Sequence, residues 1–160
     1  MLPSQNKMND ENKNKNNNSG AAAAAADIDS SSVKPLTRGA RLLLVDDEPD
    51  VLSSFKSGLE AQGYTVDGYT DSELALANFR PDTYHLLILD INMPKIDGFK
   101  LFQQLEKKDP KARVCFVTAY DTYFEAFKEI FPDLDIGYFV KKPISLKELA
   151  NKIELILLKQ

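Results

Sequence analysis

The chain has 160 residues, and with 43% hydrophobic and 28% charged residues its composition is typical of a protein with one globular domain. No apolar run approaches the roughly 20 residues that a membrane-spanning helix requires, so no membrane contact is expected. The net charge is −4, and residues 40–160 carry 15 basic and 20 acidic residues, which argues against a surface that binds nucleic acid. The only cysteine, Cys115, cannot form an intramolecular disulfide, in keeping with a cytoplasmic protein.

The first 39 residues differ in amino-acid composition from the rest of the chain. They are rich in Asn and Lys, continue into the alanine run Ala21–Ala26, and contain almost no large apolar side chains. A segment that cannot bury apolar surface does not gain enough free energy to fold. We therefore predict a disordered low-complexity tail over residues 1–39 and a single domain over residues 40–160.

From Arg41 onwards, apolar segments of strand length alternate five times with segments of helical periodicity. Capping residues and prolines mark where the helices begin and end. In chain order, the predicted elements are a strand over Arg41–Val45, a helix from Glu48 to about Gln62, a strand over Tyr64–Tyr69, a helix opened by Thr70 and ending at Arg80, a strand over His85–Asp90, a helix from about Gly98 to Lys108, a strand over Arg113–Thr118, a helix opened by Thr122 and stopped by Pro132, a strand over Ile136–Lys141, and a helix opened by Ser145.

Strands that are almost continuously apolar, alternating with amphipathic helices, indicate a parallel sheet with helices on both faces. The predicted fold class is therefore α/β, a doubly wound five-stranded parallel sheet. A flavodoxin-like (βα)5 strand order is the default for five such units, although the pattern alone leaves a Rossmann-like order open.

Polar residues follow the predicted strands at the point where each strand ends. Asp46 and Asp47 end the first strand, Asp90 the third, Thr118 the fourth, and Lys142 comes directly after the fifth. Ligands of such sheets bind at this edge, and converging carboxylates call for a hard divalent cation such as Mg²⁺, or Mn²⁺ in its place. A cation, an amine and a hydroxyl can bind phosphoryl oxygens while one carboxylate attacks phosphorus, which predicts an aspartyl-phosphate site.

Each of these residues also has a plain structural explanation. Asp46 and Asp47 could cap the next helix, Asp90 could be a turn residue, Thr118 a strand residue, and Lys142 a solvated charge. Their joint placement at one edge favours the chemical interpretation.

Four motifs occur in order at these strand ends. They are VDDE at Val45–Glu48, DINMPKIDG at Asp90–Gly98, VTA at Val117–Ala119 and KP at Lys142–Pro143. With them the chain resembles, from Arg41 to Leu158, the receiver domain of two-component response regulators, in its stand-alone, chemotaxis-regulator-like form.

The resemblance implies a role for each residue of the acidic cluster. Asp90 would accept the phosphoryl group and contact the metal. Asp47 would bind Mg²⁺ directly, Asp46 would act mainly through water, and Asn92 would offer its backbone carbonyl.

The resemblance also implies how the phosphoryl group is held and sensed. Thr118 would hydrogen-bond to it, and Lys142, followed by a cis bond to Pro143, would pair with its charge. The switch residues would be Thr118 and the aromatic side chain of the fifth strand, which is Phe139 by position. Phe139 lacks the hydroxyl of the tyrosine that is common there.

The function expected from the resemblance is that of a signalling phospho-acceptor rather than an enzyme. A sensor histidine kinase would supply the phosphoryl group, and a downstream protein or a histidine phosphotransfer protein would receive the signal. No output domain follows the last helix, whose run Leu155–Leu158 has more apolar surface than one face can bury and favours a homodimer or partner contact.

Two alternatives belong to other classes. One is an interaction module of receiver fold that works without phosphorylation. The other is a Mg²⁺-dependent phosphohydrolase with an aspartate nucleophile, of the haloacid-dehalogenase type. Enzymes of that type carry an Asp-x-Asp motif after their first strand, whereas the candidate nucleophile of this chain follows the third strand.

Overall fold

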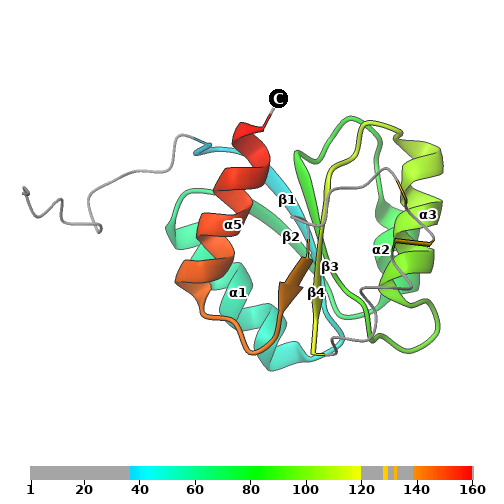
Figure 1. Cartoon of the computed structure of the whole chain (residues 1–160), viewed down its shortest axis with the longest axis horizontal. Coiled ribbons are helices and arrows are strands. Elements are labelled where there is room, and N and C mark those ends of the chain that lie inside the picture. Colours follow the sequence, from blue (N-terminus) through cyan, green and yellow to red (C-terminus); the bar gives the residue numbers. More distant parts are fainter. Residues whose placement is uncertain (1–36, 120–127, 130–131, 133–138, 160) are drawn as a thin grey trace, which may run out of the picture. The chain divides into compact units, whose positions relative to one another are not determined.

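The structure, a computed structural model, describes residues 37–119, 128–129, 132 and 139–159 (Figure 1). Within these residues, strands and helices alternate along the chain. They are β1 (Arg41–Val45), α1 (Pro49–Ala61), β2 (Thr65–Tyr69), α2 (Ser72–Asn78), β3 (Leu86–Asp90), α3 (Gly98–Lys108), β4 (Val114–Thr118), β5 (Phe139–Lys141) and α5 (Leu146–Leu158).

The five strands form one parallel sheet in the order β2-β1-β3-β4-β5. This is the flavodoxin-like order, which confirms the predicted fold class and removes the Rossmann-like alternative. Helices α1 and α5 cover one face of the sheet, and α2 and α3 cover the other (Figure 1). The strand order reverses between β1 and β3, so the carboxyl ends of these two strands flank the crevice in which such folds bind ligands.

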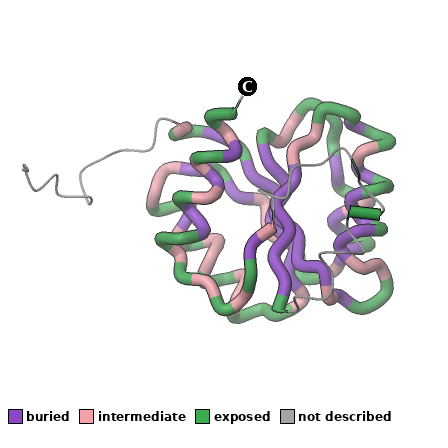
Figure 2. The backbone as a smooth tube through the Cα atoms, viewed as in Figure 1, coloured by how far each residue is buried: buried purple, intermediate pink, exposed green. Residues whose placement is uncertain are grey.

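The three central strands, β1, β3 and β4, are mostly apolar because both of their faces are covered. All five residues of β3 are buried, and its side chains alternate between two cores. Leu87 and Leu89 pack with Phe102 and other residues on the α2 and α3 side. Leu86 and Ile88 pack on the α1 and α5 side. Figure 2 shows the result, a buried central sheet whose helices are exposed on their outer surfaces.

In the four described helices, the ends agree with the sequence predictions to within about a residue except in α2. The predicted capping box of the last helix is present, with the Ser145 hydroxyl accepting a hydrogen bond from Glu148 N. In α2 the prediction of Thr70 as the cap was wrong. Asp71 is the N-cap, and its carboxylate accepts hydrogen bonds from the backbone N–H groups of residues 73 and 74. The helix also ends at Asn78, two residues early, because Phe79 is extended and turns its ring inward to stack on Tyr84 at a centroid distance of 5.7 Å.

Some predictions fall outside the described residues. These are the disordered tail over residues 1–36, most of the helix opened by Thr122, and the start of the last strand, residues 136–138. Thr37 to Gly39, which the sequence analysis assigned to the tail, form a turn whose Gly39 N donates to the Gly63 carbonyl at 2.9 Å. None of the helices among the described residues combines the length and apolar character needed to span a membrane.

Candidate functional site at the carboxyl edge of the sheet

Backbone hydrogen bonds that continue the sheet fix the positions of the polar residues beyond the strand ends. Asp46 N donates to the Tyr69 carbonyl at 3.1 Å, which extends the pairing of β1 with β2 by one residue. Lys142 N donates to the Thr118 carbonyl at 2.7 Å, which extends the pairing of β5 with β4 in the same way. The sheet therefore determines where these side chains begin.

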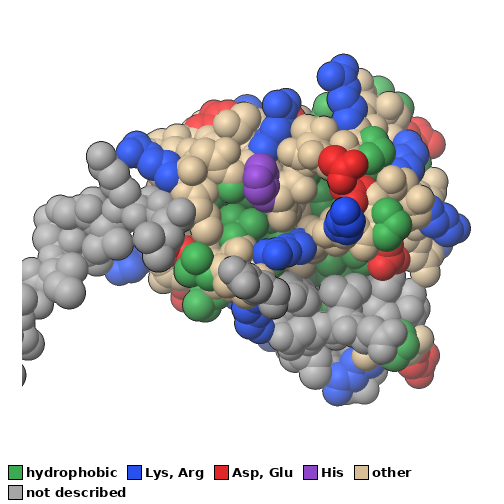
Figure 3. All heavy atoms as spheres, turned by 90° about the horizontal axis from the view of Figure 1, so that it is seen from above, with side chains coloured by type: hydrophobic (Ala, Val, Ile, Leu, Met, Phe, Trp, Pro, Cys, Tyr) green, Lys and Arg blue, Asp and Glu red, His purple; other side chains and the backbone are tan. Residues whose placement is uncertain are grey.

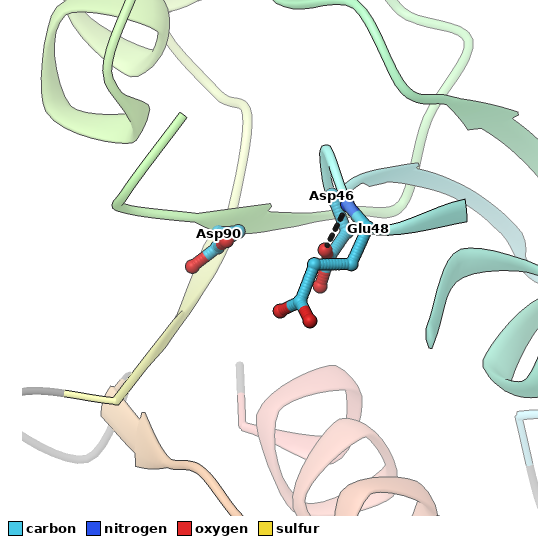
Figure 4. Close-up of side chains that lie close together, drawn as sticks. All are labelled: Asp46, Glu48 and Asp90. Atoms are coloured by element: carbon cyan, nitrogen blue, oxygen red, sulfur yellow. Dashed lines mark hydrogen bonds between the residues drawn. The ribbon is translucent and has the colours of Figure 1, made fainter. Parts of the chain in front are cut away.

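Three carboxylates converge at this edge, one from β3 and two from the segment after β1 (Figure 4). One oxygen from each of Asp46, Glu48 and Asp90 lies within 4.8 Å of the other two. Asp46 and Asp90 are only 3% and 5% exposed, whereas Glu48 lies at the exposed rim. Asp46 Oδ1 also accepts a hydrogen bond from Glu48 N at 3.0 Å, which holds the two acids of the β1 segment together.

The ammonium group of Lys142 lies among these three acids. Its Nζ is 2.9 Å from Asp46 Oδ2, 3.2 Å from Glu48 Oε1 and 3.5 Å from Asp90 Oδ2. The peptide bond between Lys142 and Pro143 is cis, as predicted. Burial by itself lowers the pKa of an ammonium group, but the hydrogen bond to Asp46 and the charge of Asp90 outweigh it, so the pKa of Lys142 lies above its ordinary value.

The surroundings of Asp90 affect its ionisation. Burial raises the pKa of its carboxyl group to about 6, against the opposing charge of Lys142, and the charge of Asp46 adds to the rise. The backbone N–H of Asn92 donates to Asp90 Oδ1 over a long 3.4 Å. Asp90 is thus a buried carboxyl group with a raised pKa and a cation beside it.

A glycine holds the loop after β3 against the backbone of Asp90. A Cβ atom on Gly98 would lie 2.3 Å from the Asp90 carbonyl oxygen, closer than any carbon can approach. The Gly98 N–H donates to the Ile91 carbonyl at 3.0 Å, and Asp97 caps α3 by accepting from Lys100 N at 2.9 Å. The loop can fold back in this way only because residue 98 has no side chain.

The same loop is attached to the start of α2 by an ion-pair network. Lys95 adopts a left-handed backbone conformation with φ of 67°. From there its Nζ reaches Asp71 Oδ2 at 2.7 Å and Glu73 Oε2 at 2.9 Å. The loop that carries Asn92 is therefore held in two places: Gly98 packs against the backbone at the end of β3, and Lys95 pairs with acids at the start of α2.

The remaining predicted site residues lie around this cluster. Thr118 is buried at the end of β4, beside β3. Asp47 is partly exposed and is not among the three acids that converge, so its predicted direct contact with a metal stays a prediction. Phe139 packs inward, with its ring centroid 5.4 Å from that of Phe116 and 6.2 Å from that of Phe99.

Sequence reasoning missed Glu48 as a member of the cluster and assigned it only to the start of a helix. The available signal was its place two residues after Asp46, a spacing at which a backbone N–H can donate to the earlier carboxylate. Its contact with Lys142, 94 residues further along the chain, has no counterpart in the local sequence.

The donor set suits a hard divalent cation. Mg²⁺ and Mn²⁺ prefer oxygen ligands, and the three converging side chains offer carboxylate oxygens. Among the described residues, the side chains of Asp46, Glu48 and Asp90 are close enough together to hold such an ion, and the contacts of Asp47 and of the Asn92 carbonyl with it stay predictions.

The sequence model of the response regulator receiver domain matches residues 42–154. The chain belongs to this family. Receiver domains are signalling phospho-acceptors of two-component systems, and this one carries an acidic cluster with a lysine at the carboxyl edge of its sheet.

Relatives agree with this assignment over the same region. The receiver protein CpdR of Brucella abortus is 31% identical over 121 residues, which is 74% of this chain and 97% of CpdR. The transcriptional regulatory protein RprY of Bacteroides fragilis is 32% identical over 120 residues, 73% of this chain but 49% of RprY. The chain thus spans about half the length of the transcriptional regulators that it matches.

Two solved receiver structures resemble the fold and the sequence together. The receiver domain of HemR from Leptospira biflexa has a TM-score of 0.67 and 27% identity, and the match covers 76% of this chain and 96% of that one. The response regulator TrrA of Thermotoga maritima, solved in complex with Mg²⁺ and BeF, has a TM-score of 0.62 and 32% identity. The match covers 73% of this chain and 98% of the TrrA chain.

Proposed function

We propose that this receiver domain takes a phosphoryl group from a sensor histidine kinase onto Asp90 and passes the signal on to a partner. The observation that carries the proposal is the position of Asp90, which is 5% exposed at the end of β3 with the Lys142 ammonium 3.5 Å from its carboxylate. A carboxylate that is shielded from water and has a cation beside it can act as a nucleophile towards an incoming phosphoryl group.

In the proposed step, an ionised Asp90 oxygen forms a bond to phosphorus while the bond from phosphorus to the donor breaks. The donor group leaves with the electron pair of that bond. Lys142 offsets the negative charge on the phosphoryl oxygens, and the Thr118 hydroxyl donates a hydrogen bond to one of them. A divalent cation held by Asp46, Glu48 and Asp90 would neutralise further charge on these oxygens.

The group is later released by hydrolysis or passed on. In hydrolysis, a water oxygen bonds to phosphorus, the bond to Asp90 breaks and inorganic phosphate leaves, so the carboxylate is restored. In a relay, the acceptor is a histidine of a phosphotransfer protein. Thr118 and Phe139 are the proposed switch residues, because a new dianion at Asp90 changes the charge next to the end of β4.

The output surface and the surroundings of the protein belong to the same proposal. Leu155 and Leu158 on α5 are 62% and 48% exposed, which offers an apolar contact for a downstream protein or a second copy of the chain. The proposed location is the cytoplasm, where a sensor histidine kinase presents its phosphohistidine.

Mass spectrometry of the intact protein tests the proposal. Incubation with acetyl phosphate and Mg²⁺ should add the mass of one phosphoryl group, and Asp90→Asn should abolish the addition. Asp97→Asn is the matched control, because it makes the same change at a helix cap outside the cluster and should leave the adduct in place. Lack of any adduct, also with phosphoramidate as donor, would instead favour an interaction module that works without phosphorylation.

A further inference from the structure

A basic cavity lies at the amino edge of the sheet, at the opposite ends of the strands from Asp90. It has a volume of about 560 Å³, and its lining comes from residues that precede β1, β3 and β4 and from the end of α5. Its polar lining includes Arg38, Lys111, Arg113 and His85. Figure 3 looks onto this end of the molecule and shows Lys and Arg side chains around the single histidine of the chain, with acidic side chains close to one of them.

The charge of the cavity is opposite to that of the domain as a whole. Residues 40–160 carry a net charge of −5. The described residues that line the cavity include three cations and no carboxylate. A concave surface with one sign of charge concentrates the electrostatic field and attracts ions of the opposite sign.

Two of these cations have no carboxylate within ion-pair distance among the described residues, although Asp82 and Asp109 line a smaller adjoining pocket that shares Lys111 and His85. Within the part of the chain that the structure describes, neither the Arg38 side chain nor that of Lys111 makes an ion pair. Arg41, which begins the neighbouring strand, behaves differently, because its guanidinium pairs with Asp67 at 2.8 Å. Among the described residues, Arg38 and Lys111 thus line the cavity without an ion-pair partner, whereas Arg41 next to it has one.

The other two polar groups are oriented by hydrogen bonds. Arg113 Nη1 donates to the carbonyls of Ile156 and Leu157 at 3.2 and 3.1 Å, which holds the guanidinium at the end of α5. His85 Nδ1 accepts a hydrogen bond from Arg41 N at 3.0 Å. The proton of the neutral ring must then be on Nε2, so this nitrogen is a donor.

We propose that this cavity binds an anion with a diphosphate group. Guanidinium groups bind phosphate oxygens in a bidentate manner, and three cations match a diphosphate better than a single carboxylate. The volume falls within the roughly 300–1,000 Å³ of small-molecule sites, and the concave shape favours a small ligand over an acidic protein surface. Inorganic pyrophosphate and a nucleoside diphosphate share this chemistry. The base of a nucleoside diphosphate could also contact the apolar part of the lining, which includes Tyr84, Ala40 and Leu157.

The single histidine makes a direct test simple, because all imidazole NMR signals belong to His85. The full chain is titrated with pyrophosphate, and separately with ADP, in a chelator at constant ionic strength, so that no cation-dependent binding at Asp90 contributes. We expect a saturable shift of the His85 ring signals. A tighter response to ADP would identify a nucleotide as the ligand, and an equal response would identify the diphosphate alone.

Variants assign the response to the cavity. The double variant Arg38→Ala, Lys111→Ala should weaken binding by about tenfold or more, since each substitution removes a charge-assisted hydrogen bond. Lys147→Ala, at the exposed start of α5, is the control for the loss of a positive charge and should bind as the wild type does. Asp90→Asn should also bind normally, which separates this site from the phospho-acceptor.

Three results would overturn the proposal. The first is the absence of any His85 shift, and the second is a shift that does not saturate and that sulfate reproduces. The third is a stronger response to an acidic peptide such as poly-glutamate, which would make the cavity a contact for a protein.

Discussion

Replacing Asp90 with asparagine should stabilise the domain against unfolding at neutral pH when no divalent cation is present. The Asp90 carboxyl has a pKa of about 6 in the folded protein, because burial disfavours its charge. In an unfolded chain the pKa of an aspartate is roughly 4. Ionised Asp90 therefore opposes folding, whereas an asparagine of the same shape carries no charge to bury.

The size and the pH dependence follow from these two pKa values. A difference of about two units corresponds to roughly 3 kcal/mol at most. The pKa of about 6 already includes the attraction of Lys142. An asparagine amide must still be buried beside that lysine, so we expect a net gain of about 1–2 kcal/mol in the free energy of unfolding. Below about pH 4 the carboxyl is protonated in both states and the gain vanishes. The gain grows between about pH 4 and the folded-state pKa of about 6, where the unfolded wild type is ionised and the folded one is not, and it levels off above that pKa.

Urea denaturation in a chelator, at a series of pH values from about 4 to about 8, measures this difference. Asp97→Asn, at the cap of α3, should show no gain that grows with pH. Added Mg²⁺ should stabilise the wild type more than the Asp90→Asn variant, since the variant lacks one ligand of the cation. The reasoning fails if the variant is less stable than the wild type at pH 7, or if its gain is the same at acid and neutral pH.

Three further substitutions probe other contacts of the fold. Gly98→Ala should lower the free energy of unfolding by roughly 2 kcal/mol in urea denaturation, because its Cβ would collide with the Asp90 carbonyl, and should also reduce the yield of phosphoprotein by mass spectrometry. Lys142→Met should destabilise the cation-free protein by about 3 kcal/mol, because it leaves the buried Asp46 without its cation, and Mg²⁺ should restore part of the loss; an unchanged urea midpoint would contradict this. Ser145→Ala should cost about 1 kcal/mol through the lost helix cap and leave phosphorylation unchanged.

Sequence periodicity predicted the central strands well because β1, β3 and β4 are buried on both faces. The continuous apolar run before Asp90 can be buried on all sides only as a central strand, and in the structure it forms β3. Helix ends were harder, since two capping residues stand side by side at positions 70 and 71. Which of them caps α2 depends on where the chain leaves β2, and the aspartate has the required extended backbone.

The acidic cluster could be predicted only in part. Asp46 and Asp90 end neighbouring parallel strands, so the fold class alone brings them together. Glu48 joins them because its backbone N–H donates to Asp46 and its carboxylate contacts Lys142. No local sequence pattern predicts either contact. The basic cavity was not foreseen for the same reason, because its lining is assembled from four separate segments.

The contacts of Lys142 have a consequence for ion selectivity. When all three acids are ionised, the cluster of Asp46, Glu48, Asp90 and the lysine ammonium carries two negative charges in excess, which one divalent cation balances. A monovalent ion would leave a residual charge in a poorly solvated place, and a trivalent ion would reverse its sign. The ammonium therefore sets the valence that the site prefers, in addition to any part it takes in holding a phosphoryl group.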